Sequence, residues 1–151
     1  MVGHEVTILL VEDDDIDAQS VVRGLHRARI TCPLVRARDG VEALDLLRGT
    51  NDKQKLKAPY LLLVDIRMPR LDGIGLIRAI RADARLSRTV IFMLTTSDND
   101  RDKLAAYDSH VAGYIVKSST SGDFQPLMAL IEYYLMIVAP PPDTEAMAAT
   151  Y

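Results

Sequence analysis

Several features that mark particular classes of protein are scarce in this sequence. Cys32 is the single cysteine, so the chain can form no internal disulfide and has no CxxC pattern for zinc. The 18 basic side chains are outnumbered by 21 acidic ones, and the net charge of −3 argues against a nucleic-acid binder that works by bulk charge. The N-terminus lacks the apolar stretch of a signal peptide. The most apolar region, 127–139, is interrupted by Glu132 and is shorter than the ~20 residues of a membrane span.

The composition that remains is that of one globular domain. The chain has 151 residues, of which 48% are hydrophobic and 26% charged, and this is enough to bury a full core. We therefore expect a soluble, reduced, cytoplasmic protein with neither a nucleic acid nor a membrane as partner.

Short apolar runs alternate with longer amphipathic stretches along the chain. The runs are rich in β-branched and aliphatic residues, which is typical of parallel strands buried on both faces. The expected strands are 6–11, 33–37, 60–64, 89–94 and 113–116, and the expected helices cover about 18–28, 41–47, 74–83, 100–109 and 124–138. Five strands alternating with five helices predict an α/β fold with a doubly wound parallel sheet.

Chemically active side chains stand where four of these strands end. Glu12 and Asp13 follow the first strand, Asp65 the third, Thr95 the fourth and Lys117 the fifth. In open α/β sheets ligands bind beyond the carboxyl ends of the strands, so these groups should meet. Neighbouring carboxylates repel one another and need a counter-ion, and oxygen ligands without histidine or cysteine suit Mg²⁺. With a lysine and a hydroxyl to meet phosphate oxygens, the set predicts phosphoryl transfer to an aspartate.

Four segments carry a resemblance to a known family. They are Ile8–Asp14 (ILLVEDD), Val64–Gly73 (VDIRMPRLDG), Met93–Ser97 (MLTTS) and Gly113–Lys117 (GYIVK). In this order, each at a strand end, they resemble the receiver domains of two-component response regulators over about residues 6–138. The resemblance implies a flavodoxin-like sheet with strand order 2-1-3-4-5, a receiver domain of residues 1–138 and a C-terminal tail of residues 139–151.

The resemblance also implies a role for each site residue. Asp65 would be the phosphoacceptor, attacking phosphohistidine on a sensor histidine kinase. Mg²⁺ would be held by Glu12, Asp13, Asp65 and the backbone carbonyl of Arg67. Lys117 and Thr95 would bind the phosphoryl group as catalytic residues, and Thr95 with Tyr114 would form the conformational switch. The protein would promote its own Mg²⁺-dependent phosphorylation and dephosphorylation without being an enzyme that turns over a substrate.

Two departures from the family pattern concern loops. Lys117 is followed by Ser118 where the family usually has a proline with a cis peptide, and a non-proline cis bond costs ~3–4 kcal/mol. The polar loop 49–59 is longer than in minimal receivers. This loop and the proline-terminated last helix resemble the stand-alone receivers that partner bacterial phytochromes, which implies a bacteriophytochrome as the kinase.

Several residues also have a simpler structural interpretation, and two other functions compete with the one above. Asp14 or Asp15 is expected to cap the first helix, and Asp72 the helix that starts near residue 74. The arginines of the segment 78–88 are expected to form a solvated face rather than a docking stripe. A phosphatase of the haloacid dehalogenase type would also use an aspartate nucleophile, but it needs a second aspartate two residues on, where this chain has Arg67. A pure interaction domain would lack the aspartate, threonine or lysine, and none is missing.

The last helix carries more apolar side chains than one buried stripe needs. They are Phe124, Leu127, Met128, Leu130, Ile131, Tyr134, Leu135, Ile137 and Val138. We expect a homodimer through the fourth helix, the fifth strand and the last helix, or else coverage of this surface by the tail. Because the chain ends about one helix after the fifth strand, output by protein contact or phosphorelay is expected, without a DNA-binding module.

Overall fold

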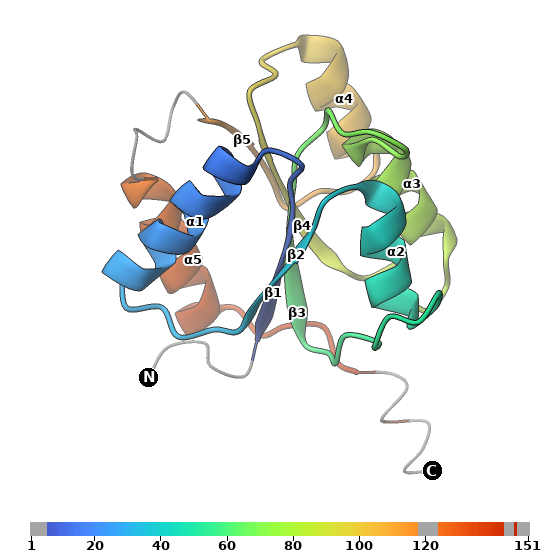
Figure 1. The fold of residues 1–151 in the computed structure, drawn as a ribbon, viewed down its shortest axis with the longest axis horizontal. Helices are drawn as coiled ribbons and strands as arrows, with labels where there is room; N and C mark the ends of the chain where they lie inside the picture. The colour runs from blue at the N-terminus through green and yellow to red at the C-terminus, as the bar shows by residue number, and fades with distance from the viewer. Residues whose placement is uncertain (1–5, 118–123, 144–146, 148–151) are drawn as a thin grey trace.

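A parallel sheet of five strands organises the computed structural model, which describes residues 6–117, 124–143 and 147 (Figure 1). The strands are β1 (Thr7–Val11), β2 (Leu34–Ala37), β3 (Tyr60–Val64), β4 (Val90–Thr95) and β5 (Gly113–Val116), and the helices are α1 (Asp15–Arg27), α2 (Gly40–Arg48), α3 (Gly73–Ala82), α4 (Asp100–Asp108) and α5 (Gln125–Ile137). The strand order is β2-β1-β3-β4-β5, so the predicted fold class is confirmed.

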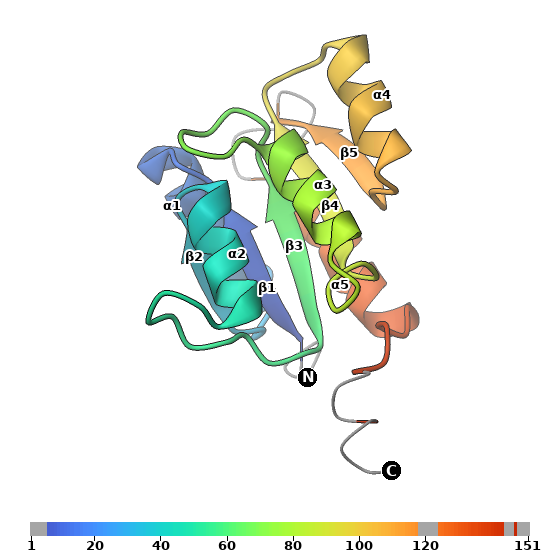
Figure 2. The same ribbon diagram turned by 90° about the vertical axis from the view of Figure 1, so that its right-hand side faces the viewer.

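The helices cover both faces of the sheet. α1 and α5 lie on one face, and α2, α3 and α4 lie on the other, as the two views show (Figure 2). Alternate residues of the central strands enter one of two apolar clusters: Leu9, Leu62 and Met93 face the α2–α3 side, whereas Ile8, Leu63 and Leu94 face α1 and α5. Burial on both faces explains why these strands read as continuous aliphatic runs.

Aspartate and asparagine side chains start four of the helices. Asp14, Asp39, Asp72 and Asn99 each accept a hydrogen bond from a backbone amide in the first turn of α1, α2, α3 and α4, respectively. The caps predicted at Asp14 and Asp72 are therefore confirmed. These caps fix where each helix leaves the carboxyl edge of the sheet, and so they fix the loops that form the site.

Arg81 does not belong to a solvated face, contrary to the sequence-based expectation. Its guanidinium donates hydrogen bonds to the carbonyls of Ser87, Thr89, Ser109 and His110. It therefore ties the end of α3 to the segments that lead into β4 and β5, which periodicity alone does not reveal. Within the described part of the chain, no helix is long and apolar enough to cross a membrane.

Candidate functional site

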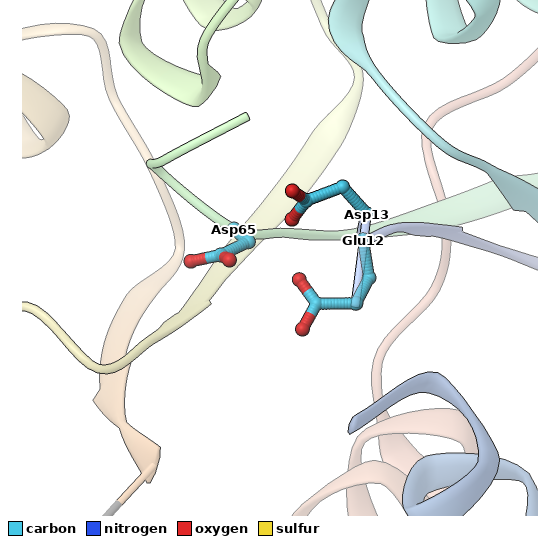
Figure 3. A group of neighbouring side chains, drawn as sticks. All are labelled: Glu12, Asp13 and Asp65. Carbon is cyan, nitrogen blue, oxygen red and sulfur yellow. The ribbon is translucent and has the colours of Figure 1, made fainter. Parts of the chain in front are cut away.

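Three carboxylates converge at the carboxyl edge of β1 and β3. One oxygen each of Glu12, Asp13 and Asp65 lies within 4.8 Å of the others. Figure 3 shows the carboxylate groups of Glu12 and Asp13 both directed toward Asp65. The backbone brings them together because the Asp65 amide donates to the carbonyl of Val11, the last residue of β1, at 3.0 Å, which continues the β1–β3 pairing one residue past the end of β3. The sequence-based prediction that these side chains meet is confirmed.

Glu12 is the most buried of the three acids, with 3% of its surface exposed. Its Oε1 accepts a hydrogen bond from Lys117 at 2.7 Å, whereas its buried Oε2 has no partner. Burial, reinforced by the neighbouring Asp65, raises the pKa of Glu12 to about 9 despite the opposing Lys117 ammonium. An unpartnered buried carboxylate oxygen facing two more carboxylates is the arrangement that a cation would stabilise.

Lys117 reaches this edge from the end of β5 and brings a positively charged ammonium group to the site. Its Nζ donates at 2.7 Å to both Glu12 and Asp17 and lies 3.8 Å from Asp65 Oδ2. Burial disfavours its charge, but the bonds to Asp17 and Glu12 outweigh burial and hold the pKa of Lys117 above its usual value. The question of a cis peptide between Lys117 and Ser118 lies outside the described residues.

The loop from Asp65 to α3 folds tightly back on itself. The Gly73 amide donates to the Ile66 carbonyl at 2.7 Å, and a side chain at Gly73 would collide with the backbone of Asp65, so only glycine fits there. Farther along, Arg70 binds the Asp39 carboxylate through two nitrogens, at 2.8 and 3.1 Å. This loop carries the Arg67 carbonyl, and its anchorage to α2 was not foreseen from the sequence.

Thr95 and Tyr114 are linked through Ser97. Thr95 is fully buried and its Oγ1 accepts from the Ser97 amide at 3.3 Å, while the Tyr114 hydroxyl donates to the Ser97 carbonyl at 2.9 Å. The Ser97 hydroxyl donates to Asp102 of α4 at 2.6 Å. A displacement of Thr95 would therefore change the contacts of Tyr114 and α4. The sequence indicated Thr95 and Tyr114 but gave no sign that Ser97 and Asp102 link them to α4.

The donor set fits a hard divalent cation. The carboxylates offer oxygen atoms alone, and the unpartnered Oε2 of Glu12 gives an ion a ligand that no other described group satisfies. Hard cations such as Mg²⁺ and Mn²⁺ prefer such oxygen ligands. Such an ion would offset the negative charge that the three carboxylates bring together.

Comparison with known proteins gives a consistent result. The sequence profile of the response regulator receiver domain matches residues 8–129. The response regulator Rcp1 of Synechocystis sp. is 33% identical over 135 residues, which cover 89% of this chain and 92% of Rcp1.

Solved structures agree with the sequence comparison. The phosphorylated cyanobacterial phytochrome response regulator RcpA is similar with a TM-score of 0.81 at 31% identity, over 93% of this chain and all of RcpA. The Mn²⁺-bound form of Rcp1 is similar with a TM-score of 0.80 at 33% identity, over 90% of this chain and 99% of that structure.

Proposed function

This chain belongs to the response regulator receiver domain family, and we propose that Asp65 accepts the phosphoryl group that a sensor histidine kinase delivers. A carboxylate oxygen of Asp65 attacks the phosphorus of phosphohistidine; the P–O bond forms as the P–N bond breaks, and the histidine ring leaves. The observation that carries the proposal is the position of Asp65, which faces two carboxylates and lies 3.8 Å from the Lys117 ammonium.

The remaining site residues take the roles that their positions support. Glu12, Asp13, Asp65 and the Arg67 carbonyl would hold Mg²⁺, with Glu12 acting directly or through water. Lys117 would donate to the phosphoryl oxygens. These groups let the protein promote its own phosphorylation and dephosphorylation, so it is a phosphoacceptor rather than an enzyme with a turned-over substrate.

Thr95 and Tyr114 would carry the signal away from Asp65. The Thr95 hydroxyl would turn to the phosphoryl group, loosen its contact with the Ser97 amide, and so disturb the Tyr114 hydroxyl bond to the Ser97 carbonyl. Because Ser97 also contacts Asp102, the change would reach α4.

The output would be protein contact or phosphorelay through residues 1–138, with 139–151 as a tail. The similarity to the phytochrome response regulator RcpA supports a phytochrome-type sensor kinase, and a bacteriophytochrome is the form that the sequence suggests. A cytoplasmic location is part of this proposal, and the acidic balance of the chain argues against binding to nucleic acid or to an anionic membrane by bulk charge.

A homodimer through α4, β5 and α5 is supported by exposed apolar side chains. On α5, Tyr133, Met136 and Ile137 are 64%, 59% and 78% exposed, and on α4 Leu104 and Tyr107 are exposed as well. Residues 141–143 of the tail lie elsewhere, where they line a cavity with residues 54–60. Apolar surface of this kind favours a partner, and a two-fold contact is its commonest form.

Labelling with acetyl phosphate tests the phosphoacceptor. With Mg²⁺, the intact mass of the wild-type protein is expected to rise by one phosphoryl group, whereas with EDTA or in Asp65→Asn it is not. Asp72→Asn is a matched control, because it changes an aspartate of the same loop that caps α3. Equal labelling of Asp65→Asn and wild type would refute the assignment.

A further inference from the structure

Asp17 contacts the site but has none of the roles described above. Its Oδ2 accepts a hydrogen bond from Lys117 Nζ at 2.7 Å, the distance at which Glu12 also accepts one. The carboxylates that gather as a cation site are Glu12, Asp13 and Asp65, without Asp17. Asp17 therefore contacts the site through Lys117 and not through the carboxylate cluster.

The position of Asp17 is fixed by the start of α1. Its backbone amide donates to the capping side chain of Asp14 at 3.0 Å, so its side chain leaves from a defined point of the first turn. The Lys117 side chain is only 10% exposed where the two meet. One small crevice is lined by Asp17, Lys117, Glu12 and Asp65. A change in the Asp17–Lys117 contact therefore alters the surroundings of the phosphoacceptor.

Glu12 and Asp17, which both accept a hydrogen bond from Lys117, differ in how a bound divalent ion would affect them. Glu12 accepts from Lys117 through Oε1 and also belongs to the carboxylate cluster with Asp13 and Asp65, so a divalent ion bound there would compete with the ammonium for Glu12. Asp17 is outside that cluster and keeps its attraction for the ammonium. Lysine has a flexible stem, so a carboxylate that keeps its hold on Nζ helps to fix the direction that places Nζ 3.8 Å from Asp65.

We propose that Asp17 is a positioning residue that holds the Lys117 ammonium beside Asp65, so that it meets the incoming phosphoryl oxygens while a cation occupies the carboxylate cluster. The inference rests on the proposed function of Asp65. It makes α1 a structural part of the phosphoryl-transfer site, although this helix contributes no group that touches the phosphoryl itself.

Removing the carboxylate should slow phosphoryl transfer without affecting the cation. For Asp17→Ala, the rate of labelling by saturating acetyl phosphate is expected to fall about tenfold, as for one lost charge-assisted hydrogen bond. The affinity for Mg²⁺, measured by calorimetry, should stay at the wild-type value, which a general loss of structure would not allow. Asp15→Ala is the matched control, since Asp15 lies in the same turn and pairs with Arg36 and Arg38 instead.

Two further variants separate charge from shape. Asp17→Glu keeps the charge and should retain more of the labelling rate than Asp17→Asn, which keeps the shape and loses the charge; the reverse order would overturn the proposal. Labelling of Asp17→Ala at the wild-type rate or faster would overturn it too, while the role of Asp65 would stand. If wild-type protein is not labelled at all with Mg²⁺, the proposed function fails, and the positioning role with it.

Discussion

Replacing Glu12 by glutamine is predicted to stabilise the cation-free protein while weakening its affinity for Mg²⁺. Glu12 is 3% exposed, its Oε2 has no partner, and it faces Asp13 and Asp65. Glutamine has nearly the same shape as protonated glutamate, and its amide oxygen can still accept from Lys117. The substitution therefore removes a buried ionisable group and leaves the packing in place.

The size of the effect follows from the pKa of Glu12, which rises from 4.5 to about 9 on folding. Folding favours the protonated form, so the stability linked to this group is full below pH 4.5 and is lost as the pH rises toward 9. One pKa unit corresponds to about 1.4 kcal/mol, so the loss is about 1 kcal/mol at pH 5, about 3 at pH 7 and about 6 at pH 9. The amount by which Glu12→Gln is more stable than wild type should grow with pH in the same way.

Urea denaturation in EDTA at pH 5, 7 and 9 measures this directly. The difference in unfolding free energy between Glu12→Gln and wild type should rise with pH, and Glu42→Gln on α2 controls for the change in net charge. With saturating Mg²⁺ the difference in unfolding free energy should become smaller, because the wild type binds the ion more tightly and is stabilised more by it. A glutamine variant that is less stable than wild type in EDTA at pH 7 and 9 would refute the reasoning, since it would mean that Glu12 is ionised and stabilised by Lys117.

Other parts of the structure give three further predictions. Asp13→Ala should lose most Mg²⁺ affinity in titration calorimetry, because a hard cation loses a carboxylate ligand; unchanged affinity would count against the site. Asp39→Ala should lower the unfolding free energy by about 2 kcal/mol, since it removes a helix cap and the partner of Arg70. Because Arg70 and the α2 amides outweigh burial and lower the pKa of Asp39, this loss should fade as the pH falls below about 4; a loss that does not fade would contradict the pairing. Sedimentation should show a dimer that Tyr133→Glu weakens; a monomeric full chain that dimerises only after truncation at Val138 would indicate coverage by the tail.

Much of the fold was predictable because its causes are local. Strands buried on both faces must be apolar at nearly every position, so the runs at 60–64 and 89–94 stand out in the sequence. Strand ends in a parallel sheet share one edge, so acids at Glu12, Asp13 and Asp65 could be expected to meet before any coordinates were known. Thr95 is the last residue of β4 rather than the first after it, a shift of one residue.

Contacts made by long side chains across the fold were not predictable. Asp17 resembles any acid in the first turn of a helix, and only the path of Lys117 from β5 makes it part of the site. Arg81 follows the spacing of a solvated face, yet it donates to carbonyls on two separate segments. Arg70 pairs with Asp39 because the loop after β3 turns toward α2, and no periodicity in the sequence encodes that direction.

Locating the acyl phosphate on the chain tests the central claim most directly. Borohydride reduces an aspartyl phosphate to homoserine, so protein labelled with acetyl phosphate and Mg²⁺ can be reduced, digested and sequenced by mass spectrometry. We expect homoserine at position 65, with Asp13 and Asp72 unchanged. Homoserine at another position with Asp65 intact, or none at all in protein that has gained a phosphoryl group, would contradict it.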